Sequence, residues 1–254
     1  TAEAEWDATA GKYKLYKEYA KPLAGDDIGV YLNFDTAEGE QIEVQMGVSF
    51  VSIENARENL NKELGKRSFD AVAQQARRSW NESLSRIMVK GGTDDQKTIF
   101  YTALYHMLIH ANVLNDVTGE YPAMDSSATL KTSGQRYTVF SLWDTYRNVH
   151  QLMTMVYPER QIEMLHSMLD MFSEGGWLPK WELFGRETFT MEGDPAIPVI
   201  VDSWMRGMRD FDIEIAYAAM RKGATTPGKD NLLRPDIDEY IENGYCAYRT
   251  PYDN

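Results

Sequence analysis

Apolar and polar residues alternate along the first fifth of the chain. Apolar residues occupy every second position of residues 30–34 and again of residues 42–50. A period of two is typical of a half-buried antiparallel strand, and the stretch Thr-Ala-Glu-Gly-Glu at 36–40 fits a hairpin connection between two such strands. The earlier stretch 12–19 fits either a strand or a helix. Because two or three strands do not make a stable sheet with a covered face, we expect this region to belong to a β domain with further strands.

From about Ser52 onward the apolar residues recur at spacings of three and four, which predicts helices. Ser52, Ser68 and Thr93 stand where the first three helices would begin, and short hydroxyl side chains are favoured N-caps. A polar loop is expected at about 115–135. The helices are expected over residues 53–64, 69–87, 94–108, 142–156, 158–174, 196–208, 210–222 and 235–243.

This order of elements predicts a mostly α chain with an N-terminal β portion. Helices joined by long, aromatic-rich loops suggest part of an α/α toroid, a ring of helical hairpins. The helices that follow residue 92 number about half of those in a complete six-hairpin ring. We therefore expect this chain to hold about half of such a ring.

The charge balance excludes several classes of partner. Lys and Arg number 26 and Asp and Glu number 39, which gives a net charge of −13. An acidic chain is a poor match for nucleic acid or for anionic lipid. No apolar run approaches the length of a membrane span, and no signal-peptide pattern opens the sequence. The single cysteine, Cys246, excludes an internal disulfide and a cysteine-based zinc site.

The aromatic content suggests a class of ligand. Aromatic residues make up 12% of the chain, with 15 Tyr and 6 Trp. Aromatic faces stack on the C–H face of a pyranose ring, and carboxylates accept hydrogen bonds from its hydroxyls, so this composition is common in proteins that handle neutral sugars. The alternative is that these aromatic residues form the core, as they do in most globular proteins.

One candidate site is the Ser-Leu-Trp-Asp-Thr-Tyr-Arg stretch at 141–147. A carboxylate at Asp144, beside the indole of Trp143 and close to Arg147, could hold a pair of sugar hydroxyls. The alternative is a capping Asp that pairs with the Arg, next to a core Trp. The spacing by itself favours this second interpretation.

A second candidate site is the aromatic loop that begins at residue 175. Two glycines and a proline limit its conformations, and it presents Trp177 and Trp181, with Glu187 just after. We expect Trp181 to face a pocket and Trp177 to pack beneath it; the alternative is a packed loop between helices. Asp194, followed by Pro195, fits a helix N-cap with proline at the first helical position.

The histidines do not predict a metal site in this chain. His106 and His110 are four residues apart, as two ligands on one helix face would be. The intervening residues are Met-Leu-Ile, so the Glu of the His-Glu-x-x-His zinc motif is missing.

Four segments together resemble glycoside hydrolase family 92, the calcium-dependent exo-α-mannosidases. Their order and spacing match along nearly the whole chain, and the second and third together are quite specific. The segments are Tyr-Thr-Ala-Leu-Tyr-His at 101–106, Phe-Ser-Leu-Trp-Asp-Thr-Tyr-Arg at 140–147, Gly-Trp-Leu-Pro-Lys-Trp-Glu-Leu at 176–183 and Met-Glu-Gly-Asp-Pro-Ala at 191–196.

The resemblance implies an architecture for a protein roughly three times as long. Residues 1–52 would be the last strands of an N-terminal β-sandwich, residues 53–91 a helical linker, and residues 92–254 the first half of an (α/α)6 catalytic barrel. The remainder of the same polypeptide would then be a partner of this segment, and the 254 residues alone are expected to be inactive.

The resemblance also implies an activity and a division of the site. The family removes terminal α-linked mannose, with α-1,2 linkages of N-glycans expected here, by an inverting, calcium-dependent mechanism. The family's acid and base segments, Glu-Gly-Asn-Ala-Trp-Gln and Gly-Asn-Asp-Asp, do not occur in this chain, so both are expected C-terminal to Asn254 in the longer polypeptide. We therefore expect neither catalytic residues nor Ca²⁺ ligands within the 254 residues.

What the matching motifs carry over is sugar binding. Trp143 and Asp144 are expected in the pocket, with Trp181 and Glu187 as weaker candidates on the adjacent loop. Pro195 stands where the family commonly has His, which puts a binding role of Asp194 in question. The expected partner is a mannose-containing oligosaccharide, and the expected location is secreted or periplasmic. The alternative is a non-catalytic α/α carbohydrate-binding or scaffold protein.

Overall fold

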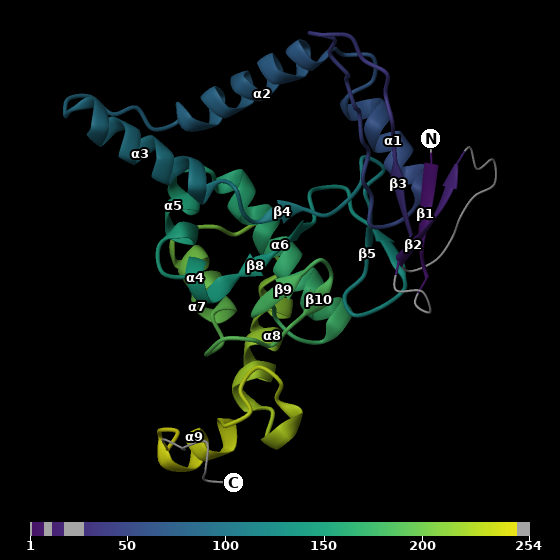
Figure 1. Cartoon of the computed structure of the whole chain (residues 1–254). Coiled ribbons are helices and arrows are strands. Elements are labelled where there is room, and N and C mark those ends of the chain that lie inside the picture. The colour runs from purple at the N-terminus through teal and green to yellow at the C-terminus, as the bar shows by residue number, and fades with distance from the viewer. Residues whose placement is uncertain (1, 8–11, 18–27, 248–254) are drawn as a thin grey trace. The chain divides into compact units, whose positions relative to one another are not determined.

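The computed structural model describes residues 2–7, 12–17 and 28–247, and the chain separates into two compact units, residues 1–44 and 45–254. Unit 1 contains a three-stranded antiparallel sheet in the order β2-β1-β3 (Figure 1). Of the stretch 12–19 that fitted a strand or a helix, residues 12–17 form a strand, and residues 18 and 19 lie outside the described residues. The strands are β1 (Ala2–Asp7), β2 (Lys12–Lys17) and β3 (Ile28–Tyr31).

The second predicted strand, over residues 42–50, is wrong. The turn before it does form: the backbone N–H of Glu40 donates to the carbonyl oxygen of Ala37 over 3.1 Å. Residues 42–50 then run without any strand assignment, and Val44 and Met46 are 72% and 76% exposed. Alternation shows which face a strand could bury, but a strand exists only beside a second backbone, and no described strand pairs with this run.

The first three helices of unit 2 begin at the predicted N-caps. The hydroxyl of Ser52 accepts from the N–H of Asn55 over 3.0 Å, and Ser68 and Thr93 cap the next two helices in the same way. At Thr93 the cap is reciprocal, because the side chain of Gln96 accepts from the N–H of Thr93. The helices are α1 (Ile53–Glu63), α2 (Phe69–Leu84) and α3 (Asp94–Met107).

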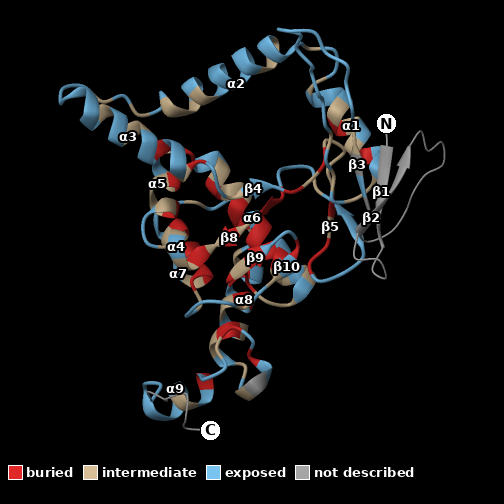
Figure 2. Ribbon diagram, viewed as in Figure 1, coloured by how far each residue is buried: buried red, intermediate tan, exposed pale blue. Residues whose placement is uncertain are grey.

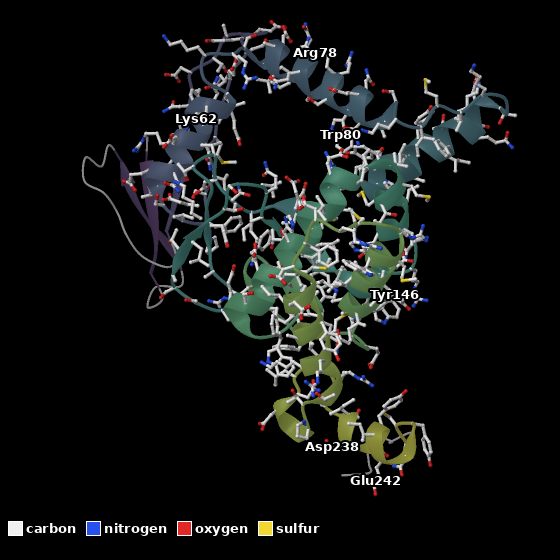
Figure 3. All side chains as sticks on the ribbon, turned by 180° about the vertical axis from the view of Figure 1, so that it is seen from behind. Lys62, Arg78, Trp80, Tyr146, Asp238 and Glu242 are labelled. Atoms are coloured by element: carbon white, nitrogen blue, oxygen red, sulfur yellow. The ribbon has the colours of Figure 1, made fainter. Side chains whose placement is uncertain are left out.

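The apolar stripes of α2 and α3 are less covered than their periodicity suggests. No residue of α2 is buried, and Phe69 and Ile99 are 72% and 69% exposed (Figure 2). Trp80 of α2, labelled in Figure 3, contacts α3: its ring centroid lies 4.5 Å from that of Tyr105. A helical period fixes the direction of a face, whereas its burial depends on what packs there.

Short strands connect α3 to the later helices. The predicted loop at 115–135 contains the pair β5 (Glu120–Pro122) and β6 (Thr129–Lys131). The other strands are β4 (Asn112–Val113), which pairs with β7 (Tyr137–Thr138), and β8 (Phe140–Ser141), β9 (Trp181–Leu183) and β10 (Arg186–Glu187), which form a sheet in the order β10-β9-β8.

The predicted single helix over 142–156 is two helices. The chain leaves the helical path at Asn148, where φ is −153°. The side-chain amide of Gln151 donates to the carbonyl oxygen of Tyr146 over 2.9 Å, which satisfies one of the acceptors freed by the break. The later helices are α4 (Leu142–Thr145), α5 (Val149–Val156), α6 (Pro158–Gly175), α7 (Ala196–Met205), α8 (Ile213–Thr225) and α9 (Ile237–Asn243), with a 3₁₀ turn at Gly228–Asp230.

The core of unit 2 lies among α5, α6, α7 and α8 and the strand β8. Figure 2 shows the buried residues concentrated in these elements. Leu165, Met168 and Met171 of α6 are completely buried, and Val199 of α7 and Ala216 of α8 are equally covered. Of the helices in the described part of the chain, none combines the length and the apolar character that a membrane crossing requires.

A buried carboxylate ties α1 to the strands that follow α3. Asp116 accepts hydrogen bonds from the hydroxyl of Ser49 over 2.6 Å and from the amides of Asn55 and Asn59 over 2.8 and 2.6 Å. Both asparagines lie on the polar face of α1 and are nevertheless buried, at 9% and 8% exposure. This polar face is therefore an internal contact that holds α1.

We expect Asp116→Ala to destabilise unit 2 by about 3–5 kcal/mol. The substitution removes one acceptor from each of two buried amides, which keep their bonds to Glu120 and to the carbonyl oxygen of Val48. Breaking a buried charged network is among the costlier single changes. Thermal unfolding of the protein that carries this chain measures the effect. Asp238→Ala, at an exposed position of α9 labelled in Figure 3, is the matched control and should change the melting temperature little. Equal melting temperatures for the two variants would contradict the prediction.

Candidate functional site

A cavity of about 400 Å³ opens where the end of α3, the strands β8 and β9, the end of α4, the start of α5 and Met164 of α6 come together. Its wall is mostly apolar and includes the indole of Trp181. A small number of polar groups on an apolar wall is the usual composition of a small-molecule site. The polar or ionisable side chains that line it are those of His106, His110, Ser141, Asp144, Thr145 and His150.

The pairing of β8 with β9 brings the two candidate motifs together. Phe140 lies opposite Glu182, and Ser141 lies opposite Trp181, in antiparallel register. The segment around Asp144 and the aromatic loop are about 40 residues apart in sequence and become one wall of the cavity. Asp144 and Trp181 both line it, whereas Trp143 and Glu187 are not among its lining residues.

Asp144 lies three residues into α4 and is exposed. The N-cap of this helix is Ser141, and the Asp144 carboxylate accepts a short hydrogen bond from the Ser141 hydroxyl. The described residues show no ion pair between Asp144 and Arg147; the guanidinium of Arg147 stacks instead over the ring of Trp143, 5.0 Å from its centroid. The capping-and-pairing interpretation of Asp144 therefore does not describe its surroundings.

Glu187 fixes the backbone of the aromatic loop. Its carboxylate accepts from the N–H groups of Lys180, Trp181 and Phe189 over 2.7, 3.0 and 2.8 Å. These charge-assisted bonds hold the backbone on both sides of the turn and so hold the indole of Trp181 against the cavity. Trp177 packs against the core, with the ammonium of Lys222 4.4 Å from its ring centroid.

Glu182 has an internal role that the sequence analysis missed. It is completely buried and accepts from the hydroxyl of Thr138 and from the N–H groups of Val139 and Gly185 over 2.8, 2.9 and 2.6 Å. Burial raises the pKa of Glu182, and these bonds lower it in part. Because it alternates with Trp181 on β9, period-two reasoning could have placed it on the opposite side of the strand.

His150 and Thr145 are also residues whose part in the site the sequence analysis did not find. His150 is 4% exposed, and burial lowers the pKa of its imidazole, which keeps the ring neutral. One ring nitrogen, Nε2, lies 3.0 Å from the hydroxyl oxygen of Thr145, and Nδ1 lies 3.0 Å from the side-chain oxygen of Gln161. The available signal was Gln161, a polar residue within the apolar stripe of α6.

The described residues contain no group of three or more His, Cys, Asp or Glu side chains that could hold a metal ion. His106 and His110 both line the cavity, and Nδ1 of His110 lies 2.8 Å from the side-chain oxygen of Asn112.

The catalytic acid and base are expected C-terminal to Asn254, beyond the last residue of this sequence. Asn254 itself lies outside the described residues, which end at Ala247. Among the described residues that line the cavity, the one carboxylate is that of Asp144, which the motifs assign to sugar binding. The position of the acid and the base after Asn254 therefore stays a prediction.

Asp194 is not the N-cap that the sequence predicts. The cap of α7 is Pro195, without a side-chain bond, and both carboxylate oxygens of Asp194 are buried without a hydrogen-bond partner. A Cβ atom at Gly223 would lie 2.7 Å from one of them, so a larger residue there would displace the Asp194 carboxylate. Burial raises the pKa of Asp194 to about 6, although Arg234 and Lys180 act to lower it.

Comparison with known proteins gives one family. The model of the glycosyl hydrolase family 92 catalytic domain matches residues 55–254. Among curated proteins, none matches the chain significantly. The mostly helical structure with a few small strands is similar to solved structures of this family.

Three solved structures illustrate the similarity. A family GH92 alpha-mannosidase from Bacteroides thetaiotaomicron, in complex with mannoimidazole, is 33% identical with a TM-score of 0.71, over 78% of this chain and 25% of that one. A family GH92 inverting mannosidase from Bacteroides thetaiotaomicron VPI-5482 is 27% identical with a TM-score of 0.82, over 97% and 33%. A gh92 family glycosyl hydrolase at 22% identity and a TM-score of 0.57, over 77% and 30%, shares the fold. The chain thus spans a quarter to a third of the length of these relatives.

We expect Asp194→Asn to stabilise the fold at pH 8 and to have little effect at pH 4. The folded state keeps the Asp194 proton up to a pH of about 6, whereas an unfolded chain releases it near its ordinary pKa of about 4. The free energy of unfolding therefore falls as the pH rises between these values and stays lower above them. The neutral amide avoids this loss, which is on the order of 2–3 kcal/mol.

The effect is measured as the melting temperatures of the wild-type protein and of the Asp194→Asn variant at pH 4 and pH 8. Asp230→Asn, at an exposed position, is the control and should not show the difference between the two pH values. If Asp194→Asn stabilises the protein equally at pH 4 and pH 8, or destabilises it at pH 8, then the charged form of the Asp194 carboxylate is not unfavourable in the folded protein.

Proposed function

Because the chain belongs to glycosyl hydrolase family 92, we propose that this protein hydrolyses terminal α-linked mannose from mannosides. The observation that carries the proposal is the cavity in which the family's two sequence motifs meet, with Asp144 and Trp181 on one wall. The relatives that resemble the chain in sequence and structure include an alpha-mannosidase and an inverting mannosidase.

The geometry supports a sugar-binding role for this segment. The indole of Trp181 offers an apolar face to the C–H groups of a pyranose, and the carboxylate of Asp144 offers two acceptors to its hydroxyls. The bonds of Glu187 to the loop backbone hold Trp181 before substrate arrives, which lowers the ordering cost of binding. A sugar held in one orientation is positioned for attack at its anomeric carbon.

We infer further that the reaction inverts the anomeric configuration. Inverting glycosidases need one carboxylic acid that protonates the leaving oxygen and one carboxylate that activates water. Among the described residues that line the cavity, Asp144 is the one carboxylate. We infer that both the catalytic acid and the catalytic base belong to sequence that follows Asn254. Trp143 and Glu187 then contribute through the structure around the pocket, by stacking and by holding the loop.

Several finer points belong to the same proposal. We infer that the substrate is α-1,2-linked mannose of N-glycans, that Ca²⁺ is bound by residues outside this chain, and that the protein acts in a secreted or periplasmic setting. We also infer that residues 1–52 are the end of a β-sandwich, residues 53–91 a linker, and residues 92–254 the first half of an (α/α)6 barrel. These points rest on the resemblance of the sequence motifs to the family; the family model itself matches residues 55–254, and the ranges 1–52 and 92–254 include residues that the structure does not describe.

A non-catalytic carbohydrate-binding protein is the second candidate function. The observation in its favour is that the cavity, as lined by the described residues, contains one carboxylate where an inverting hydrolase uses two. If the protein binds mannosides without hydrolysing them, it is a non-catalytic carbohydrate-binding protein.

The deciding experiment is an assay of the protein that carries this chain on α-1,2-mannobiose. We expect release of mannose, with the β-anomer appearing first in the proton NMR spectrum. Treatment with a chelator should abolish the release, and added Ca²⁺ should restore it. The α-anomer as first product would overturn inversion, and activity that persists in the chelator would overturn the metal requirement.

We expect Asp144→Ala to lower kcat/KM by about 10²–10⁴-fold with a small effect on stability. Charge-assisted hydrogen bonds to two sugar hydroxyls are each worth about 1.5–3 kcal/mol, while the exposed carboxylate makes few contacts in the free protein. Steady-state kinetics and melting temperatures measure the two effects. Asp95→Ala, at an exposed position of α3, is the control, and an unchanged rate with a lowered melting temperature would assign Asp144 a structural role.

A further inference from the structure

A line of hydrogen-bonded side chains runs from the cavity into the core. It begins at the hydroxyl of Thr145, which lines the cavity, and passes through His150 and Gln161 to Ser203. The last three residues are 4%, 0% and 1% exposed and come from α5, α6 and α7. Their apolar neighbours include Met164, also on the cavity wall. Polar groups at such depth need complete hydrogen bonding, so this line has little freedom to rearrange.

The direction of these hydrogen bonds is fixed from the inner end. The hydroxyl of Ser203 lies 2.7 Å from the carbonyl oxygen of Val199, which can only accept, so Ser203 donates there. Its oxygen is then free to accept from the amide nitrogen of Gln161 at 3.1 Å. This orientation turns the amide oxygen of Gln161 toward Nδ1 of His150, 3.0 Å away. Because an amide oxygen only accepts, Nδ1 carries the imidazole proton.

The outer end of the line follows from this tautomer. A neutral imidazole with its proton on Nδ1 has a lone pair on Nε2, so the hydroxyl of Thr145 donates to it over 3.0 Å. The other neighbour of that hydroxyl is the carbonyl oxygen of Ser141 at 3.3 Å, which is also an acceptor. Nε2 of His150 and the carbonyl oxygen of Ser141 both accept from the Thr145 hydroxyl, so its proton points away from the cavity. The lone pairs of the hydroxyl oxygen can then accept from a ligand in the cavity.

Asp144, the residue before Thr145, also offers hydrogen-bond acceptors. Asp144 is a carboxylate and accepts, and the hydroxyl of Ser141 donates its proton to it. The side chains of Ser141, Asp144 and Thr145 all line the cavity, and their internal hydrogen bonds leave acceptors on each of them for a ligand.

We propose that the edge of the cavity formed by Ser141, Asp144 and Thr145 accepts hydrogen bonds from neighbouring sugar hydroxyls and donates none to them. His150 is the positioning residue that fixes this direction of hydrogen bonding. The proposal rests on the mannoside-binding function above and specifies how the hydroxyls are recognised. Thr145 is a binding residue in it, and Gln161 and Ser203 act through His150. The edge discriminates against a ligand group that accepts without donating, because two sets of lone pairs would then face each other.

The test compares methyl α-mannoside with its 2-, 3-, 4- and 6-deoxyfluoro analogues as inhibitors of mannoside hydrolysis. Fluorine is close to a hydroxyl in size and cannot donate. We expect the wild-type protein to bind the hydroxyl about 10-fold or more better than fluorine at one position at least. Thr145→Val, which keeps the shape and removes the oxygen, should reduce that preference at one such position to within about 3-fold, while Thr145→Ser should retain it.

A preference that is unchanged in Thr145→Val would overturn the proposal, even if the variant melts at a lower temperature. That pattern would show a role in packing alone. If the wild-type protein neither binds nor hydrolyses mannosides, the function proposed above fails. The direction of the hydrogen bonds at this edge of the cavity is then tested by the tautomer of His150 alone.

The tautomer is measured independently of any ligand. Spectra of the protein labelled with ¹⁵N-histidine, assigned by comparison with His150→Gln, should show a protonated Nδ1 and an unprotonated Nε2 for this residue. A proton on Nε2 would overturn the proposal, because Thr145 would then accept from His150 and could turn its own proton toward the cavity. Gln161→Leu should relax the preference for Nδ1, whereas exposed Gln135→Leu, the matched control, should not.

Discussion

The antiparallel pairing of β8 with β9 is the contact on which the candidate site depends. It joins a strand that runs directly into α4 to a strand that follows α6, and it sets Ser141 beside Trp181. A shift of one residue in this register would turn the indole of Trp181 to the other side of the sheet. The strands are only two and three residues long, so their ladder alone could not maintain the register.

Carboxylates that accept several hydrogen bonds supply the missing rigidity. Glu182 sits beneath the pairing and gathers donors from the segments before β8 and after β9, while Glu187 gathers three N–H groups of the aromatic loop. Asp116 has the same role between α1 and the strands after α3. A carboxylate that accepts several N–H or amide donors fixes their relative positions more tightly than apolar contact does, since each bond has a preferred direction. The net charge of −13 is thus partly internal structure.

The site combines this rigid frame with a polar edge of defined direction. Apolar residues and Trp181 form most of the cavity wall, and the acceptors of Asp144 and Thr145 face the space that they enclose. Such an arrangement suits a ligand with one apolar face and a row of donors, which describes a pyranose. The hydrogen bonds along this line also offset the cost of placing His150 and Gln161 in a core of Met and Leu side chains, where unpaired polar groups would be costly.

The sequence by itself determined the helical character, the helix starts at Ser52, Ser68 and Thr93, and the two motifs that contain Asp144 and Trp181. These features depend on local interactions, such as a hydroxyl that accepts from an N–H three residues later. Only the tertiary structure decided that residues 42–50 are not a strand, that Asn55 and Asn59 are internal, and that Glu187 binds the loop backbone. Each of these outcomes depends on a partner distant in sequence or on the direction of a side chain, which hydrophobic periodicity does not encode. The line from Thr145 to Ser203 was unforeseeable for the same reason, because its four residues meet only when α4, α5, α6 and α7 pack together.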